Sequence, residues 1–235
     1  MAFDLENFLK SLQEAINYLP VTIKLTVVTF VFSLIIGSLI AIIRNYNIPL
    51  LSEFFAFFVT VYNGLPLMVA LVIYNLLYMN YYSRIASFFH ISKSISDISP
   101  IYVGYFALIM SSSCIYSETI RGALKSIDKL QYEAGYSIGL NKFQTLRRII
   151  IPQLIPVALP GLTNNLVGTI KESNLVSAIG ILEVMGGAIT PCAISYSYLE
   201  GYLAAAVVYW GFSATLEFLI KRGEHYGTRY RRSLA

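Results

Sequence analysis

The chain has 235 residues, of which 56% are hydrophobic and only 13% charged, with a formal net charge of +4. Soluble domains usually carry about 25% charged residues, and the mean hydropathy here is +0.63, so the composition excludes an ordinary soluble domain and indicates that lipid is the main solvent. Membrane proteins gather Lys and Arg in cytoplasmic loops. This tendency explains the pI near 8.9 better than nucleic-acid binding does, and we expect no nucleic-acid partner.

The N-terminal stretch is predicted to be an amphipathic segment over residues 3–18. It lacks a basic region, a short apolar core and a small-residue cleavage site, so a cleaved signal peptide is not expected. We therefore divide the chain into an N-terminal segment at 1–20, a transmembrane domain at 21–222 and a basic cytoplasmic tail at 223–235.

Five apolar runs in the transmembrane domain are candidates for membrane-spanning helices. A hydrocarbon core of about 30 Å requires roughly 20 helical residues. The runs that meet this length lie near residues 21–43, 54–77, 101–120, 148–170 and 198–220. Asn63, Gly64 and Pro66 interrupt the second run, and three prolines interrupt the fourth. Such breaks are tolerated in lipid only where protein or a water-lined cavity satisfies the freed carbonyl groups. The expected fold class is an all-α membrane protein with about five transmembrane helices around a transport pathway.

The basic residues predict how the chain is oriented in the cell membrane. If the N-terminus is outside, all but five of the 17 Lys and Arg residues fall on the cytoplasmic side, the exceptions being Lys10, Lys24, Arg84, Lys93 and Lys171. The positive-inside rule therefore favours an outer N-terminus and a cytoplasmic C-terminus. An odd number of spans requires the two ends to lie on opposite sides, and the two predictions agree.

The loop between the third and fourth runs is predicted to form two short helices. Asp128 can cap the first helix, with Gln131 reaching back to it, and Gly139 can end that helix with a positive φ. Asn141 and Gln144 repeat the capping signal just before the fourth run. Judged from these residues alone, the loop is either an ordinary amphipathic connector that touches headgroups or a rigid knob that a soluble partner can grip.

The spacing within residues 131–152 is more specific than the capping signals. Glu, Ala and Gly are followed after three residues by Gly, and after nine more by Ile-x-Ile-Pro; the positions are Glu133, Ala134, Gly135, Gly139, Ile149, Ile151 and Pro152. This pattern resembles the EAA loop of binding-protein-dependent ABC permeases. Gly135 stands for the second Ala of that motif and Ile151 for its Leu, and both keep a small or apolar side chain. Residues 22–26, 64–69, 117–124 and 171–180 are similar to the polar amino-acid branch of the family.

The resemblance implies a type I ABC importer permease fold with a cytoplasmic coupling helix. It also implies two cytoplasmic ATPase subunits, a second permease (a copy of this chain or a paralogue) and an extracytoplasmic substrate-binding protein as partners. Contact with the ATPase is expected at Glu133, Ala134, Gly135, Gly139, Ile149 and Pro152. The chain contains no G-x-x-x-x-G-K-[ST] segment, so ATP and Mg are expected on the partner ATPase, and no cofactor is expected in this chain.

Uncharged polar residues at mid-depth are candidates for the substrate pathway, because they can hydrogen-bond the amino and carboxylate groups of an amino acid. They are Asn63, Gly64, Ser112, Ser113, Asn164 and Asn165. The alternative role is helix–helix packing, for which Ser and Asn are often used in membranes. The family that this chain resembles usually has a basic residue before the Gly-Leu-Pro-Leu motif, where this sequence has Asn63, so a substrate-binding charge is not expected there. Glu118 and Arg121, at the inner end of the third run, are predicted to pair three residues apart.

Two other classes of protein were compared with a permease. A secondary transporter usually shows internal repeats, and no half-to-half repeat is evident in this chain. An enzyme needs a catalytic constellation, but His90 and His225 have no metal-spacing partner or nucleophile nearby, and Cys114 and Cys192 form no CxxC pair. No catalytic or metal-binding residue is therefore predicted.

The transported amino acid is suggested only by local similarity. Residues 183–189 and 198–210 look most like permeases for cystine and related sulfur amino acids. Basic amino acids and glutamine are the alternatives. A cationic side chain would need a carboxylate partner in the membrane, and few acidic residues lie within the predicted spans.

Overall fold

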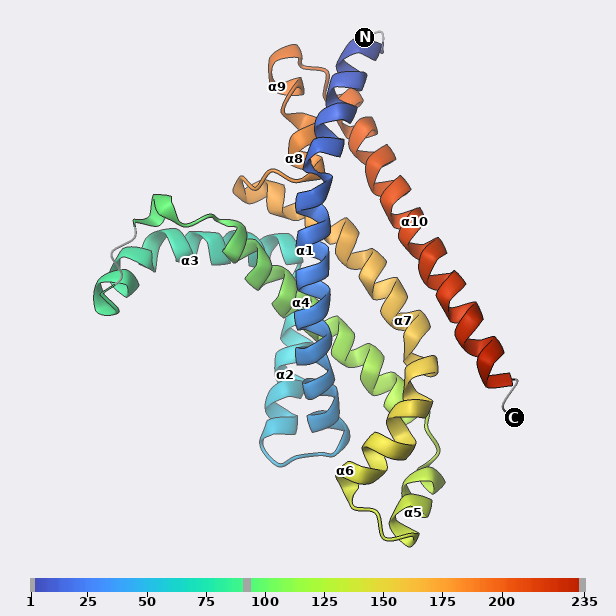
Figure 1. Ribbon diagram of the computed structural model, residues 1–235. Coiled ribbons are helices and arrows are strands. Elements are labelled where there is room, and N and C mark those ends of the chain that lie inside the picture. Colours follow the sequence, from blue (N-terminus) through green and yellow to red (C-terminus); the bar gives the residue numbers. More distant parts are fainter. Residues whose placement is uncertain (1–2, 91–93, 233–235) are drawn as a thin grey trace. The chain divides into compact units, whose positions relative to one another are not determined.

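The computed structural model describes residues 3–90 and 94–232, and side chains as far as residue 222 except that of Ser96. All regular elements in these ranges are helical, which confirms the predicted class (Figure 1). They are α1 (Leu5–Asn45), α2 (Leu51–Gly64), α3 (Leu67–Phe88), η1 (Ile95–Asp97), α4 (Ile101–Lys125), α5 (Lys129–Ser137), α6 (Lys142–Thr145), the π-helical turn η2 (Leu146–Ile150), α7 (Ile151–Glu172), η3 (Ser173–Ile179), α8 (Val184–Ile189), α9 (Cys192–Ser195) and α10 (Tyr198–Arg232).

The helices form two compact units. Unit 1 contains Met1–Thr29, Leu67–Leu108 and Val167–Ala235, and unit 2 contains Phe30–Pro66 and Ile109–Leu166. Helices α1, α4 and α7 each contribute residues to both units. Each unit has its own buried clusters, so the packing of each is described separately.

Unit 1 is built on close contacts between helices with small side chains. One buried cluster joins α1, α8 and α10 through Ala15, Val184, Ala188, Ala205 and Val208. A methyl group at Gly187 would lie 2.5 Å from the ring of Tyr18, and one at Gly201 would lie 2.5 Å from the sulfur of Cys192. Small residues of this kind let helices approach one another in membranes, where van der Waals contact rather than water exclusion drives association.

Unit 2 joins the second half of α1 to α4 and to the loop that follows α4. Its larger cluster contains Ala41, Ile120, Leu124, Leu146 and Ile150, with Tyr132 and Leu154 among the half-buried neighbours. A second cluster, centred on Val59 and Cys114, packs α2 against α4. The first cluster supports α5 and α6, which lie together at one end of unit 2 (Figure 1).

Helix α1 runs without a break through the predicted boundary at residue 20. Pro20 lies inside the 41-residue helix, and Ser11, Ala15, Thr22 and Leu25 are fully buried on both sides of it. Their spacing places them on one helical face. The N-terminal segment is therefore continuous with the first span, and the same buried stripe extends along both.

Fewer helices than expected have the length and composition of a membrane span. In the part of the chain that the structure describes, Leu5–Asn45, Lys142–Ile179 and Tyr198–Arg222 qualify, and α2 with α3, bent by 103° at their break, makes a fourth if the pair is one span. The second predicted span is thus two helices, separated at Leu65 and Pro66. The third predicted span corresponds to α4, which is long enough but falls outside this set, because serines, tyrosines and Glu118 lower its hydropathy.

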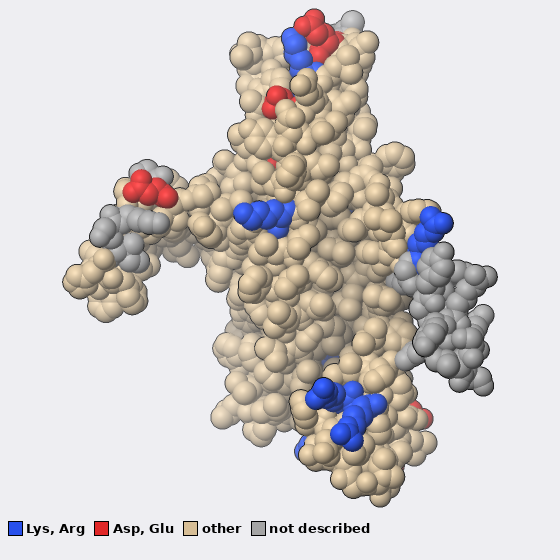
Figure 2. Space-filling model, viewed as in Figure 1, with Lys and Arg blue, Asp and Glu red and all other residues tan. Residues whose placement is uncertain are grey.

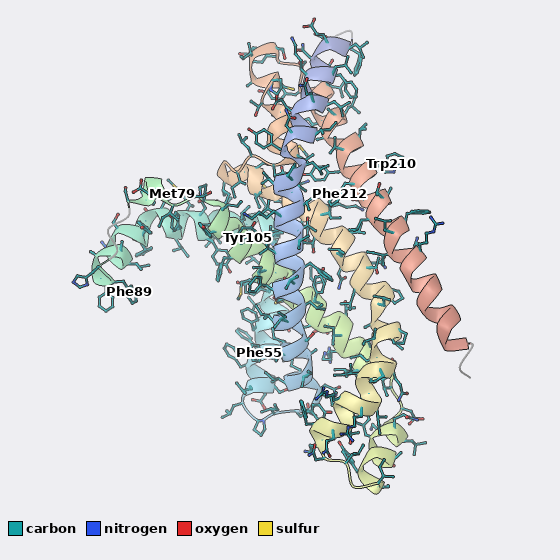
Figure 3. All side chains as sticks on the ribbon, in the orientation of Figure 1. Phe55, Met79, Phe89, Tyr105, Trp210 and Phe212 are labelled. Carbon is teal, nitrogen blue, oxygen red and sulfur yellow. The ribbon has the colours of Figure 1, made fainter. Side chains whose placement is uncertain are left out.

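The outer surfaces of these helices are apolar, as expected for lipid contact. Trp210 on α10 is 74% exposed, and Figure 3 labels it among the side chains that project from the bundle. Two sequence predictions lie beyond the described side chains: the basic character of residues 223–235 and the environment of His225. The backbone as far as Arg232 continues α10.

Candidate functional site

Helix α5 is capped at both ends in the way that its sequence predicts. The Asp128 carboxylate accepts the Leu130 N–H at 2.9 Å and caps the start of the helix. At the other end Gly139 has a φ of 83°. The Leu140 N–H donates to the Gly135 carbonyl at 3.1 Å, and the Gly139 N–H donates to the Tyr136 carbonyl at 2.9 Å. This pair of bonds is the Schellman motif, which satisfies carbonyls that would otherwise be unpaired at a helix end.

The second short helix, α6, is capped at its start by a reciprocal pair. Asn141 accepts the Gln144 N–H, and Gln144 accepts the Asn141 N–H, both at 2.9 Å. This confirms the predicted capping box. The prediction for Gln131 is wrong: its side-chain oxygen accepts a hydrogen bond from Gln153 at 3.1 Å, and no capping box forms on α5. Gln131 thereby links α5 to the first turn of α7.

Gly135 is the point at which α5 rests on the elements that follow it. A methyl group there would lie 2.6 Å from Thr145 Cγ2 and 3.1 Å from Ile149 Cδ1, and Thr145 is itself fully buried. Carbon atoms do not approach to 2.6 Å without displacement, so an alanine does not fit this packing. Gly135 stands where the family's motif has its second Ala, and Thr145 occupies the space that an alanine methyl group would need there.

The remaining predicted coupling residues divide between the surface and the interior of the loop. Glu133, Ala134, Gly139 and Pro152 are exposed, whereas Ile149 is half-buried. Three apolar side chains of the loop also face outward: Leu130 is 64% exposed, Ile138 74% and Phe143 69%. Lys and Arg side chains gather over the same loop in Figure 2. The loop is thus a rigid, doubly capped projection with an apolar surface and basic surroundings.

An ion-pair network holds the base of this projection. Arg121 pairs with Glu118 at 2.6 Å, as predicted. Arg44, near the end of α1, also donates to the second carboxylate oxygen of Glu118. The side chain of Arg44 is only 12% exposed, so the carboxylate ties α1 to α4 at the point from which the loop departs. Sequence reasoning missed Arg44 because its partner is 74 residues away.

Three of the predicted pathway residues make packing contacts within unit 2. Ser112 and Ser113 are buried, and Ser113 donates to the Ile109 carbonyl at 2.6 Å. Asn165 on α7 donates to Thr119 Oγ1 on α4 at 2.8 Å. These positions match the helix-packing alternative.

The other three pathway candidates lie on the surface of unit 2. Asn63, Gly64 and Asn164 are exposed. The six candidates are not brought together in the cavity of about 430 Å³ that the structure describes in this unit. That cavity is lined instead by the turn between α1 and α2 and by α6, through Tyr46, Asn47, Ile48, Pro49, Lys142, Phe143 and Leu146.

A buried carboxylate in unit 1 was not identified from the sequence. Glu183 is fully buried and caps α8 through the N–H groups of Met185 and Gly186, at 2.8 and 3.3 Å. It also accepts hydrogen bonds from Thr22 of α1, at 3.1 Å, and from the Tyr209 hydroxyl of α10. Burial raises the pKa of this carboxyl, and the four donors oppose that rise. Glu183 therefore joins three helices, and no sequence signal revealed its distant partners.

No set of three or more His, Cys, Asp or Glu side chains within the described ranges is arranged to hold a metal ion. Cys114 and Cys192 are both buried and unpaired with each other.

Comparison with known proteins identifies the family. The family model described as "Binding-protein-dependent transport system inner membrane component" matches residues 9–224. The chain belongs to this family. The permease is 32% identical over 211 residues to a "Probable amino-acid ABC transporter permease protein" of Vibrio harveyi, covering 90% of each chain. It is 30% identical over 223 residues to the "L-cystine transport system permease protein" of Bacillus subtilis (strain 168), covering 95% of this chain and 91% of that one.

Solved structures agree with the family assignment. The permease superposes on the structure called "Crystal structure of an amino acid ABC transporter with histidines" with a TM-score of 0.78 at 29% identity, covering 96% of this chain and all of that one. Its fold also matches a chain of the MetNI methionine ABC transporter, with a TM-score of 0.69 at 17% identity.

The permease is therefore the membrane-embedded subunit of an amino-acid ABC importer with the type I fold, and it crosses the membrane several times. It is not an enzyme, since ATP hydrolysis in this family belongs to a separate subunit.

Proposed function

We propose that this permease imports cystine or a related sulfur amino acid by alternating access. The observation that carries the choice of substrate is the 30% identity to the L-cystine permease of Bacillus subtilis over 95% of the chain. Residues 183–189 and 198–210, which resemble cystine-type permeases, support it. A relative from Rickettsia conorii named for glutamine transport is 31% identical over 201 residues, so glutamine is the second candidate. Basic amino acids are a third.

The proposed complex has two cytoplasmic ATPase subunits, two permease subunits and an extracytoplasmic binding protein. The α5–α6 loop is the proposed ATPase contact. Its caps and its Gly135 packing make it rigid, and Leu130, Ile138 and Phe143 offer an apolar surface. The proposed orientation has the N-terminus outside and the C-terminus in the cytoplasm, because the basic residues of α5, α6 and the end of α10 then lie inside.

The test of this function is uptake by a complete transporter. The permease is co-expressed with its ATPase and binding protein in a host deficient in cystine uptake, and radiolabelled L-cystine is measured with unlabelled L-glutamine or L-arginine as competitors. We expect cystine uptake that requires the ATPase and that neither competitor reduces. Uptake of glutamine but not cystine would assign the second candidate. Uptake without the ATPase would indicate a secondary transporter and overturn the proposal.

A further inference from the structure

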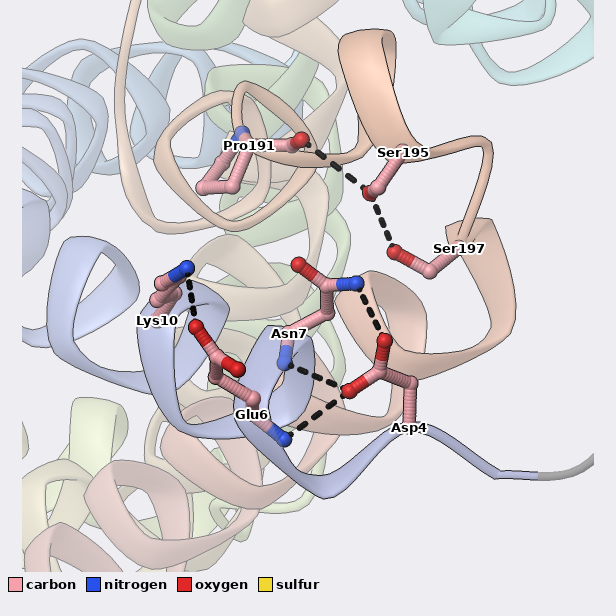
Figure 4. A network of polar contacts seen from close by, with 7 residues as sticks. All are labelled: Asp4, Glu6, Asn7, Lys10, Pro191, Ser195 and Ser197. Carbon is pink, nitrogen blue, oxygen red and sulfur yellow. Dashed lines mark hydrogen bonds and ion pairs between the residues drawn. The ribbon is translucent and has the colours of Figure 1, made fainter.

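A cavity of about 340 Å³ lies in unit 1 where the first turn of α1 meets the first turn of α10. It is lined by Phe3, Asp4, Asn7 and residues 195–200. Nothing in the permease function described above makes use of this cavity. Figure 4 shows polar contacts beside it, within the start of α1 and within residues 191–197, which precede α10.

The wall formed by α1 is rigid because Asp4 caps the helix. One carboxylate oxygen accepts the N–H groups of Glu6 and Asn7 at 3.0 and 3.2 Å, and the other accepts the Asn7 side-chain amide at 2.6 Å (Figure 4). The Asp4 N–H donates to Glu200 Oε1 at 2.8 Å and so fixes α1 to α10. The cavity is therefore a preformed feature of two packed helix starts.

Asp4 and Glu200 are the acidic residues that line this cavity, and Glu200 is the more deeply buried of the two. Only 5% of it is exposed. Its Oε1 accepts the Asp4 N–H, and no other described residue bonds to either carboxylate oxygen. None of the lining residues is a Lys or Arg, and Lys10, on the same turn of α1, pairs instead with Glu6 at 2.6 Å. Buried charges are normally paired, so the cavity is built for a cationic group.

The rim of the cavity is apolar and aromatic. Phe3 is 50% exposed, Tyr196 74% and Leu199 63%. Tyr196 is held there by a left-handed backbone with a φ of 56°. Contiguous exposed apolar surface of this kind marks protein contact sites. A cavity lined by a carboxylate and by aromatic side chains suits an Arg or Lys side chain, which can gain both an ion pair and cation–π contact.

We propose that this cavity receives an Arg or Lys side chain of the extracytoplasmic binding protein when that protein docks on the permease. The inference rests on the proposed function and on its orientation. Glu200 lies at the start of α10, whereas Lys221 and Arg222 lie some twenty residues further along the same helix. The positive-inside rule places that basic part in the cytoplasm and therefore the cavity outside. A free amino acid would fill the centre of the cavity but leave the apolar rim uncovered, which is why a protein side chain is the favoured occupant.

The test compares Glu200→Gln with Glu6→Gln in the complete transporter in nanodiscs. Both changes remove one negative charge at the same end of unit 1, but Glu6 does not line the cavity. Glutamine keeps the oxygen that accepts the Asp4 N–H, so the fold is expected to hold, and the melting temperature checks it. Binding of the transporter's own purified binding protein is measured by surface plasmon resonance. We expect Glu200→Gln to weaken binding at least tenfold and Glu6→Gln to change it less than twofold.

A second variant guards against a folding artefact. Ser197→Lys leaves the Asp4 N–H and the Glu200 carboxylate that bond to each other unchanged and supplies a cation from within the cavity, so it is expected to weaken binding to a similar extent. Equal affinity for the wild type and both cavity variants would overturn the inference. Saturable binding of free L-arginine that Glu200→Gln abolishes, without any change in protein binding, would assign a small-molecule site and also overturn it. If the wild-type transporter shows no response to the binding protein, the proposed function itself fails.

Discussion

At the scale of single residues, the most informative side chain is Glu183. All four groups bonded to its carboxylate are donors: two backbone N–H groups and the hydroxyls of Thr22 and Tyr209. An ionised carboxylate only accepts, so it satisfies every one of them. This arrangement also excludes a cation at the site, because the lone pairs are directed at protein donors.

Glu183→Gln is expected to destabilise unit 1, although the two side chains have nearly the same shape. The amide nitrogen would face one or two donors and leave them buried without an acceptor, which costs about 1–3 kcal/mol. The measurement is the melting temperature of purified permease. Glu53→Gln, at an exposed position of α2, is the matched control and should melt with the wild type. Equal melting of both variants would show that the hydrogen bonds to Glu183 contribute little.

The contact of Gly135 with Thr145 permits a double-mutant test. Gly135→Ala is expected to cost about 1–3 kcal/mol, the usual range for overpacking, because the new methyl group meets Thr145 Cγ2 at 2.6 Å. Thr145→Ala removes that obstacle, so the double variant should recover most of the lost stability. The melting temperature and the amount of ATPase that co-purifies are measured for the wild type, for each single variant and for the double variant. Additive losses would mean that the two residues do not share this packing.

At the scale of the elements, local capping explains why α5 and α6 were predicted accurately. Asp128, Gly139 and the Asn141–Gln144 pair each act within a few residues of their partners. Gln131 behaves differently because its partner, Gln153, lies 22 residues further along the chain. The candidate pathway residues show the same limit, since which neighbour Asn165 meets depends on how α7 packs against α4.

Gly139→Val is expected to leave the protein inserted but to uncouple it from the ATPase. The glycine has a φ of 83°, and an added Cβ would meet no neighbouring atom within 4 Å, so the penalty is backbone strain alone. That strain is at least about 1 kcal/mol for a β-branched residue. Gly139→Asn is the control, because Asn tolerates a left-handed backbone. Full ATPase binding and uptake in the Val variant would contradict the docking assignment.

The two adjacent asparagines of α7 are expected to respond differently to substitution. Asn164→Leu, at an exposed position, should reduce substrate affinity roughly ten- to a hundredfold by removing a bond worth about 1.5–3 kcal/mol to a charged ligand group. Asn165→Leu removes the bond to Thr119 and should lower the melting temperature instead. Uptake assays and thermal melting separate the two effects. Normal uptake in both variants would remove both residues from the pathway.

At the scale of the whole molecule, the number of membrane crossings depends on α4. Five spans place the two ends on opposite sides, whereas the four that qualify by composition would place them on the same side. Polar residues in α4 are compatible with a crossing if neighbouring helices shield them from lipid.

Cysteine labelling tests whether α4 crosses the membrane. Cys114 and Cys192 are replaced, and single cysteines are placed at His90 and His225. With α4, α7 and α10 all crossing, a membrane-impermeant reagent should label position 90 from outside and position 225 only from inside. Labelling of both positions from the same side would show that α4 does not cross.

The sequence by itself determined the class of the protein, its family and the capping of its exposed loop. Apolar run length, the spacing of the EAA-like residues and helix-capping signals are all local properties, and local properties can be read directly along the chain. Only the tertiary structure decided the roles of Glu183, Gly135, Arg44 and Glu200. Each role depends on a partner that is distant along the chain or on the bulk of a neighbouring helix. Which groups a buried charge bonds to, and how closely two helices pack, is decided only when separate segments fold against one another.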